Sequence, residues 1–203
     1  MKIICIGRNY AEHAKELNNV VPTEPVFFMK PDTALLKDNE PFYYPDFTND
    51  LHHELEIVLK INKVGKHIDE QFAHKYYSEI GLGIDFTARD LQEQQKAKGL
   101  PWEKAKAFDG SAPIGNFIHK DTLNDLLAIN FELKVNGNTR QIGNTNDLLF
   151  SFDKIIAYVS KFVTLKVGDL IFTGTPAGVA SVKVGDKLQG FMQGNLMLEF
   201  EVK

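Results

Sequence analysis

The clearest alternation of polar and apolar residues covers residues 52–59, His-His-Glu-Leu-Glu-Ile-Val-Leu. Successive side chains of a strand point to opposite faces, so the pattern predicts a strand over 52–61 with one face in the core. The run 129–135 alternates in the same way, and Asn136-Gly137 after it is a strong hairpin signal. Short apolar runs predict further strands at 2–7, 26–29 and 80–86.

Four other segments have features of helices. Asn9, with Glu12 three residues later, predicts a helix that ends near Leu17. The aromatic and apolar residues of 72–80 are spaced for a second helix. A third would run from a Thr87 cap to Gly99, and a fourth, amphipathic one would follow Ser151. Because strands dominate and do not alternate regularly with helices, we expect one β-rich α+β domain, residues 1–203.

Composition narrows the kind of protein. The 203 residues are 43% hydrophobic and 25% charged, with a net charge of −4, which gives no reason to expect nucleic acid or a membrane as partner. No apolar run is long enough to span a bilayer, and the N-terminal run lacks the features of a signal peptide. The single cysteine, Cys5, lies in an apolar run and is interpreted as a core thiol. A cytoplasmic location is therefore expected.

Two carboxylates and a third nearby in sequence suggest metal chemistry. Glu54 and Glu56 share one strand face, about 7 Å apart. Alone, they are more typical of a solvated strand face. Asp85 follows Gly81 and Gly83 on one face of the next strand, where the glycines either leave room for a ligand or admit a neighbouring backbone. Three such oxygen ligands would suit Mg²⁺ or Mn²⁺.

Other polar residues have spacings that fit either a site or a solvated surface. His13 and Glu16 share a helix face, as do Arg89 and Gln92 on the helix after Asp85. An arginine can bind a carboxylate with two hydrogen bonds. The turn around Thr175 could present donors to an anion, or be an ordinary β-turn. Lys30, at a strand end, is a weaker candidate for the same role.

Four motifs together resemble the fumarylacetoacetate hydrolase family, in particular its short members that act on acylpyruvates. They are His52-His53-Glu54-Leu55-Glu56, Asp85-Phe86-Thr87-Ala88-Arg89-Asp90-Leu91-Gln92, Gly99-Leu100-Pro101-Trp102 with Lys106, and Gly174-Thr175-Pro176-Ala177-Gly178-Val179. The likeness starts at Gly7-Arg8-Asn9-Tyr10, and the N-terminal domain of the longer members has no counterpart here. Ala180 departs from the glycine that relatives often carry.

The resemblance implies a mixed β-sandwich roll with flanking helices, usually a homodimer. It implies that Glu54, Glu56 and Asp85 hold the metal, with Mg²⁺ the usual ion and Mn²⁺ or Ca²⁺ as alternatives. It places His13 and Glu16 on a lid, residues 8–25, where they activate water, and it gives Lys106 the role of stabilising an oxyanion. Arg89, Gln92, Thr175 and Lys30 are then candidates for binding a 2-oxo acid substrate.

The expected reaction is hydrolysis of a carbon–carbon bond in a 2,4-dioxo acid such as fumarylpyruvate or acetylpyruvate, through a metal-stabilised pyruvate enolate. Decarboxylation of oxaloacetate or isomerisation of a 2-oxo-dienoate could use the same site. A non-catalytic module that binds metal or carboxylate is a further alternative, although it has less need of so many polar groups.

Overall fold

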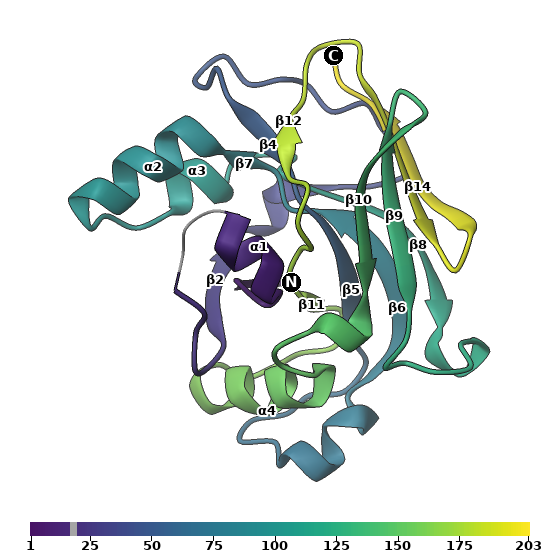
Figure 1. Cartoon of the computed structure of the whole chain (residues 1–203). Coiled ribbons are helices and arrows are strands. Elements are labelled where there is room, and N and C mark those ends of the chain that lie inside the picture. The colour runs from purple at the N-terminus through teal and green to yellow at the C-terminus, as the bar shows by residue number, and fades with distance from the viewer. Residues whose placement is uncertain (17–19) are drawn as a thin grey trace.

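The central feature of the computed structural model, which describes residues 1–16 and 20–203, is a curved seven-stranded sheet (Figure 1). Its strand order is β2-β1-β11-β5-β6-β8-β3, and most neighbours are antiparallel. The strands are β1 (Ile3–Gly7), β2 (Val26–Lys30), β3 (Leu35–Leu36), β5 (Leu55–Ile61), β6 (Tyr77–Ile84), β8 (Ala112–His119) and β11 (Leu170–Phe172). The β-rich α+β fold class expected from the sequence is confirmed.

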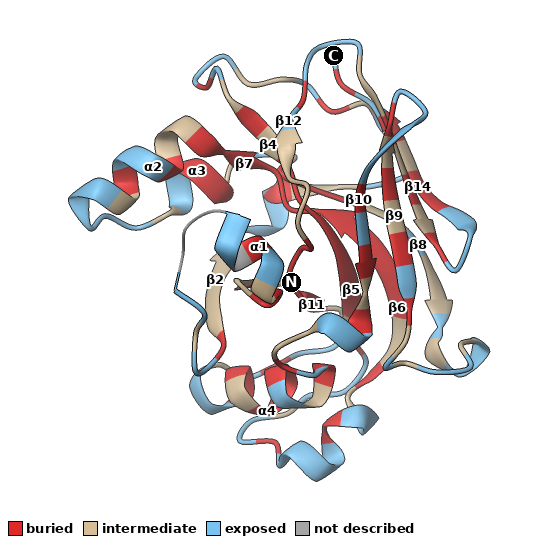
Figure 2. Cartoon of the chain, viewed as in Figure 1, coloured by how far each residue is buried: buried red, intermediate tan, exposed pale blue. Residues whose placement is uncertain are grey.

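Two smaller sheets complete the roll. The first has the order β10 (Asn138–Asn144), β9 (Asn130–Val135), β13 (Lys187–Met192), β14 (Asn195–Glu201). The second consists of β12 (Ala180–Ser181), β4 (Leu51–His53) and β7 (Thr87–Ala88). The first sheet packs closely on the central one, since a Cβ added to Gly190 of β13 would lie 3.2 Å from Leu82 of β6. The main core lies between these two sheets, where β5 and β6 are buried (Figure 2).

Helices lie at the edges of the sheets (Figure 1). They are α1 (Ala11–Glu16), α2 (Arg89–Lys98), α3 (Glu103–Lys106) and α4 (Phe152–Phe162), with 3₁₀ turns at Asp32–Ala34, Glu70–Lys75, Lys120–Thr122 and Thr145–Asp147. Within the described residues, no helix is long and apolar enough to cross a membrane.

Several local predictions are confirmed. Asn136 and Gly137 have φ angles of 52° and 77° and join β9 to β10 as a tight hairpin turn. The Ser151 hydroxyl accepts a hydrogen bond from the backbone N–H of Lys154 at 3.2 Å and caps α4. Gly99 ends α2 with a φ of 64°. Cys5 is fully buried in β1, as expected for a core thiol.

Other local predictions are wrong. The helix expected over 72–80 is present only as a 3₁₀ turn that ends at Lys75, because Tyr77–Ile84 pair with β5 as strand β6. The strand expected over 52–61 is interrupted at Glu54, which separates β4 from β5. Thr87 belongs to β7 and caps nothing, since α2 starts after Ala88 without a side-chain cap.

Asn9 does not cap the first helix either, because that helix starts at Ala11. Its buried amide instead donates to the carbonyl oxygens of Phe150 and Thr173 at 3.1 and 2.8 Å, and accepts from the Phe150 N–H. Asn9 therefore ties the chain before α1 to two distant loops. The predicted end of this helix, Leu17, lies outside the described residues.

Candidate metal centre and active site

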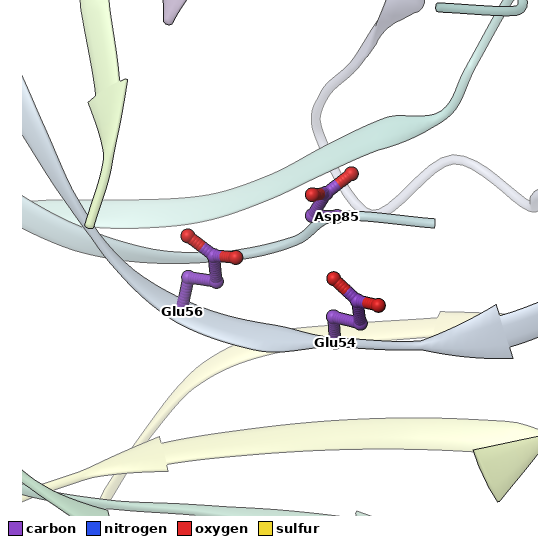
Figure 3. Close-up of side chains that lie close together, drawn as sticks. All are labelled: Glu54, Glu56 and Asp85. Carbon is purple, nitrogen blue, oxygen red and sulfur yellow. The ribbon is translucent and has the colours of Figure 1, made fainter. Parts of the chain in front are cut away.

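Three buried carboxylates meet where β5 and β6 run side by side (Figure 3). Glu54 precedes β5, Glu56 lies in it, and Asp85 follows β6, with the Asp85 N–H donating to the Glu54 carbonyl at 2.8 Å. One oxygen of each carboxylate lies within 4.8 Å of the others, and all three residues are at most 5% exposed. The solvated strand face considered from the sequence is therefore excluded.

The two glycines before Asp85 do not leave room for a ligand. A Cβ at Gly83 would lie 2.6 Å from the Phe172 ring, and one at Gly81 would lie 2.9 Å from the Asn116 carbonyl oxygen. Their second interpretation, the close approach of neighbouring protein groups, is the one the structure supports.

Three buried basic side chains surround the carboxylates. Lys106 Nζ lies 2.8 Å from Glu54 Oε2 and 2.7 Å from Asp85 Oδ2. Arg89 Nη2 lies 2.5 Å from Glu54 Oε1. Lys30, at the end of β2, is fully buried with its Nζ 2.7 Å from Asp85 Oδ1, so the solvated strand-end lysine considered from the sequence is excluded.

Glu56 differs from its two neighbours. Among the described residues no basic group lies within 4.0 Å of it, and its one hydrogen-bond donor is the Gly174 N–H, 2.6 Å from Oε2. Burial, followed by the negative charges of Asp85 and Glu54, raises the pKa of Glu56 well above its usual range. The site thus contains a buried carboxylate that is short of positive charge.

Glu54 shows the opposite balance. Burial alone would raise its pKa, but the charges of Lys106, Arg89 and His13 outweigh burial and hold the pKa of Glu54 well below its usual range. Lys106 is also shifted: burial lowers its pKa, but Asp85 and Glu54 outweigh burial, so the net shift is upward.

The short helix α1 closes one side of this cluster. His13 is 5% exposed and lines the same small cavity as the three carboxylates. Its Nδ1 lies 3.3 Å from Glu16 Oε2, and the Glu16 carboxylate also accepts the Gly178 N–H at 3.1 Å. The contact to Gly178 anchors α1 to the loop after Pro176, so His13 and Glu16 are not an ordinary solvated helix pair.

The remaining predicted residues also gather here. Arg89 Nη1 donates to Gln92 Oε1 at 2.6 Å, and both side chains are buried. Thr175 lines the cavity, but its hydroxyl donates to the Leu55 carbonyl at 2.8 Å. The backbone N–H of Gly174 meets the protein's own Glu56. The turn thus presents a donor to an anion, and that anion is a side chain of the site.

Gln141 was not expected from the sequence. Its side-chain oxygen lies 2.9 Å from His53 Nδ1 and accepts the Leu55 N–H, while its nitrogen donates to the Thr175 hydroxyl and the Pro176 carbonyl. It joins the start of β5 to the loop that carries Thr175. A glutamine in an alternating strand gives no sequence signal for such a role.

The cavity between these groups has a volume of about 30 Å³, enough for an ion or a water molecule. A shallow hollow beside α2 and α3 is larger, about 490 Å³, but it is lined mostly by apolar atoms and contains none of the three carboxylates. The site combines buried acids with a buried lysine and arginine inside a β-rich roll. This combination is typical of enzymes that hold a divalent cation and bind an anionic substrate.

Comparison with known proteins agrees with this class. The family model for the fumarylacetoacetate (FAA) hydrolase C-terminal region matches residues 2–202, and the chain belongs to this family. It is 45% identical to the mitochondrial oxaloacetate tautomerase of Mus musculus, over 99% of this chain and 91% of that one. It is 45% identical to the mitochondrial oxaloacetate decarboxylase of Dictyostelium discoideum, over 93% and 87%.

A solved structure gives the same picture. The fumarylpyruvate hydrolase of Pseudomonas aeruginosa, in complex with Mn²⁺ and pyruvate, superposes with a TM-score of 0.94 at 36% identity, covering 100% of this chain and 89% of that one. The resemblance inferred from the four sequence motifs is confirmed.

Proposed function

We propose that this protein is a divalent-metal-dependent enzyme that acts on a chelating 2-oxo acid by forming its enolate. The observation that carries the proposal is Glu56, a buried carboxylate with no basic partner among the described residues, beside two further carboxylates. The donor set of Glu54, Glu56 and Asp85 fits Mg²⁺ or Mn²⁺, which prefer carboxylate oxygens. Such a cation, when bound, supplies the positive charge that stabilises an enolate oxygen.

The basic residues would bind and orient the substrate. Arg89 keeps its buried Nε–H without a hydrogen-bond partner among the described residues, so this donor is free for a substrate carboxylate. Gln92 holds the guanidinium through Nη1. Lys106 lies between two of the carboxylates, where its ammonium can also face a developing oxyanion.

His13 is the proposed base. When Nδ1 carries the proton and forms a hydrogen bond to the Glu16 carboxylate, Nε2 keeps a lone pair inside the buried site. This nitrogen could take a proton from the carbon beside the keto group, or from a water molecule. The anchor at Gly178 supports α1, which lies within the predicted lid, as the element that carries this base over the substrate.

His13 could thus take a proton from the substrate carbon or from water. Of these two, we propose the first, enolisation of oxaloacetate, as the main reaction. The relatives at 45% identity are named for reactions of oxaloacetate, and proton transfer needs only the base and the charge-stabilising groups above. Hydrolysis of an acylpyruvate is the second candidate, because the His13–Glu16 pair could activate a water molecule and the hydrolase from Pseudomonas aeruginosa has the same fold. The homodimer and the cytoplasmic location remain predictions.

A panel assay tests the proposal. Purified protein is given enol-oxaloacetate, fumarylpyruvate and acetylpyruvate, with Mg²⁺, with Mn²⁺ or with a chelator, and tautomer conversion, acid release and carbon dioxide release are followed separately. We expect conversion of oxaloacetate that the chelator abolishes. Turnover of none of the three substrates at saturating metal would favour the non-catalytic module instead.

A further inference from the structure

Two basic residues of the cavity have no acidic partner among the residues that the structure describes. Arg8, directly after β1, and Lys96, on α2, line the cavity together with the three carboxylates. In the part of the chain that the structure describes, neither side chain forms a salt bridge within 4.0 Å or a hydrogen bond. Lys30, Arg89 and Lys106, by contrast, are all paired with Glu54 or Asp85.

The backbone of Arg8 and the side chain of Lys96 are constrained by their surroundings. Arg8 has a φ of 61°, a left-handed conformation that is unfavourable for a residue with a side chain and that persists only where the neighbouring structure imposes it. Lys96 lies seven residues after Arg89, on the same face of α2. Its Nζ lies 5.8 Å from the centre of the Trp102 ring.

Trp102 places the two cations in the same wall of the cavity. A Cβ built on Gly7 would lie 4.0 Å from Trp102 Cζ3, so the indole lies against the end of β1, next to Arg8. The Trp102 ring also meets Phe28 of β2 at a centroid distance of 5.8 Å. The result is an aromatic wall of Trp102 and Phe28 that lies against Lys96 and next to the residue that follows β1, Arg8.

The electrostatics of this wall are unbalanced. The pKa of Lys96 is lowered, most strongly by burial and next by the positive charges of Arg89 and Arg8. The negative charge of Glu54 offsets this lowering only in part. Since Glu54 and Asp85 are already paired with Lys30, Arg89 and Lys106, the positive potential around Arg8 and Lys96 is available to a negatively charged ligand.

We propose that Arg8 and Lys96 form a second anion subsite, which binds the distal carboxylate of a dicarboxylic 2-oxo acid. The inference rests on the proposed function, in which the 2-oxo acid end of the substrate faces Glu54, Glu56 and Asp85. A substrate with a charged far end, such as oxaloacetate or fumarylpyruvate, satisfies both cations. A substrate with a neutral far end, such as acetylpyruvate, leaves them unpaired, which makes this pair a determinant of specificity.

The test uses unreactive ligands in matched pairs. Titration calorimetry on the full chain with saturating Mg²⁺ compares 2-oxoglutarate with 2-oxovalerate, and 2-oxoadipate with 2-oxohexanoate. The members of each pair share the chelating end and the chain length and differ only in the distal carboxylate. The two pairs cover two distances between the metal centre and the subsite.

We expect wild-type protein to prefer the dicarboxylic member of at least one pair by tenfold or more. Arg8→Gln and Lys96→Gln should each weaken that ligand by about tenfold and leave its uncharged partner within about twofold. Lys98→Gln is the matched control, because Lys98 is an exposed lysine on the same helix that does not line this cavity. It should change neither affinity.

Two results would overturn the subsite while leaving the proposed function intact: both pairs binding without preference for the dicarboxylic member, or the Arg8 and Lys96 variants weakening both members equally. If none of the four acids binds to the Mg²⁺-loaded wild type, the chelating role of the carboxylates is wrong, and the subsite falls with it.

Discussion

Replacing Glu54 or Glu56 by glutamine removes one negative charge from the same cluster, yet the two changes should affect the metal-free protein in opposite ways. Glu54 neutralises Arg89 and Lys106 at 2.5 and 2.8 Å, so Glu54→Gln leaves the buried Arg89 without an acidic partner and Lys106 with Asp85 alone. Glu56 has no basic partner among the described residues, so Glu56→Gln removes an uncompensated buried charge. Glutamine also keeps an oxygen that can accept the Gly174 N–H.

The magnitudes follow from burial. Breaking a buried ion pair from one side costs about 3–5 kcal/mol, which for a chain of this length lowers the melting temperature by roughly 10 °C. Glu56→Gln should cost nothing and could raise the free energy of unfolding by up to about 2 kcal/mol. The variants should therefore differ by at least about 3 kcal/mol in chelator. With Mg²⁺ at 100 times its dissociation constant, wild type gains about 2.7 kcal/mol, and both variants should lose most of that gain.

Chemical denaturation in chelator and in Mg²⁺ measures both effects. The pH dependence gives a further check. The pKa of Glu56 is raised in the folded state, so its destabilising effect is full above that raised pKa and disappears as the pH falls toward the unfolded value, about 4.3. The advantage of Glu56→Gln over wild type should shrink over the same range. If Glu56→Gln destabilises the metal-free protein as much as Glu54→Gln does, the inferred difference between the two carboxylates is refuted.

Three further predictions concern the base, the sheet packing and the thiol. His13→Ala should abolish tautomer conversion of oxaloacetate and hydrolysis of acylpyruvates but spare decarboxylation of oxaloacetate, and a variant that keeps its tautomer conversion and hydrolysis would refute the assignment of the base. Gly115→Ala should destabilise the protein by about 3 kcal/mol or more in a denaturant titration, because its Cβ would lie 2.0 Å from the Met197 carbonyl oxygen, whereas Gly194→Ala, with open space around it, should cost only about 1 kcal/mol. Cys5 should react with a thiol reagent only at the rate of unfolding, since it is fully buried and burial raises its pKa.

The strands were predictable wherever alternation was the dominant local signal. Leu55–Ile61 and Asn130–Val135 form strands because one face of each is buried by the sheet opposite, although Glu54 interrupts the first run. The helix prediction for 72–80 was wrong because apolar residues three to four apart fit a helix. The segment from Tyr77 on is instead a strand because Tyr77 and Ile80 pair with Ile61 and Leu59 of β5. That pairing depends on the whole sheet, and no local pattern contains it.

The site was predictable only as far as spacing and family resemblance reach. A period of two puts Glu54 and Glu56 on one face, and antiparallel pairing of β5 with β6 brings Asp85 beside them. Lys30 and Gln141 could not be placed in this way. Lys30 reaches Asp85 from β2, which is not a neighbour of β6 in the sheet, and Gln141 reaches the start of β5 from β10 in another sheet.

Glu54 and Glu56 show why the chemistry of a site is harder to predict than its position. They are the same residue type, two positions apart in sequence, yet their pKa values shift in opposite directions. The difference arises from groups distant in sequence: Glu54 meets Arg89 and Lys106, 35 and 52 residues away, whereas Glu56, among the residues described, meets only the N–H of Gly174, 118 residues away. Because α2 and α3 carry the cations to one carboxylate and not the other, the fold itself leaves one buried acid without a counter-charge, and that shortage favours the binding of a cation.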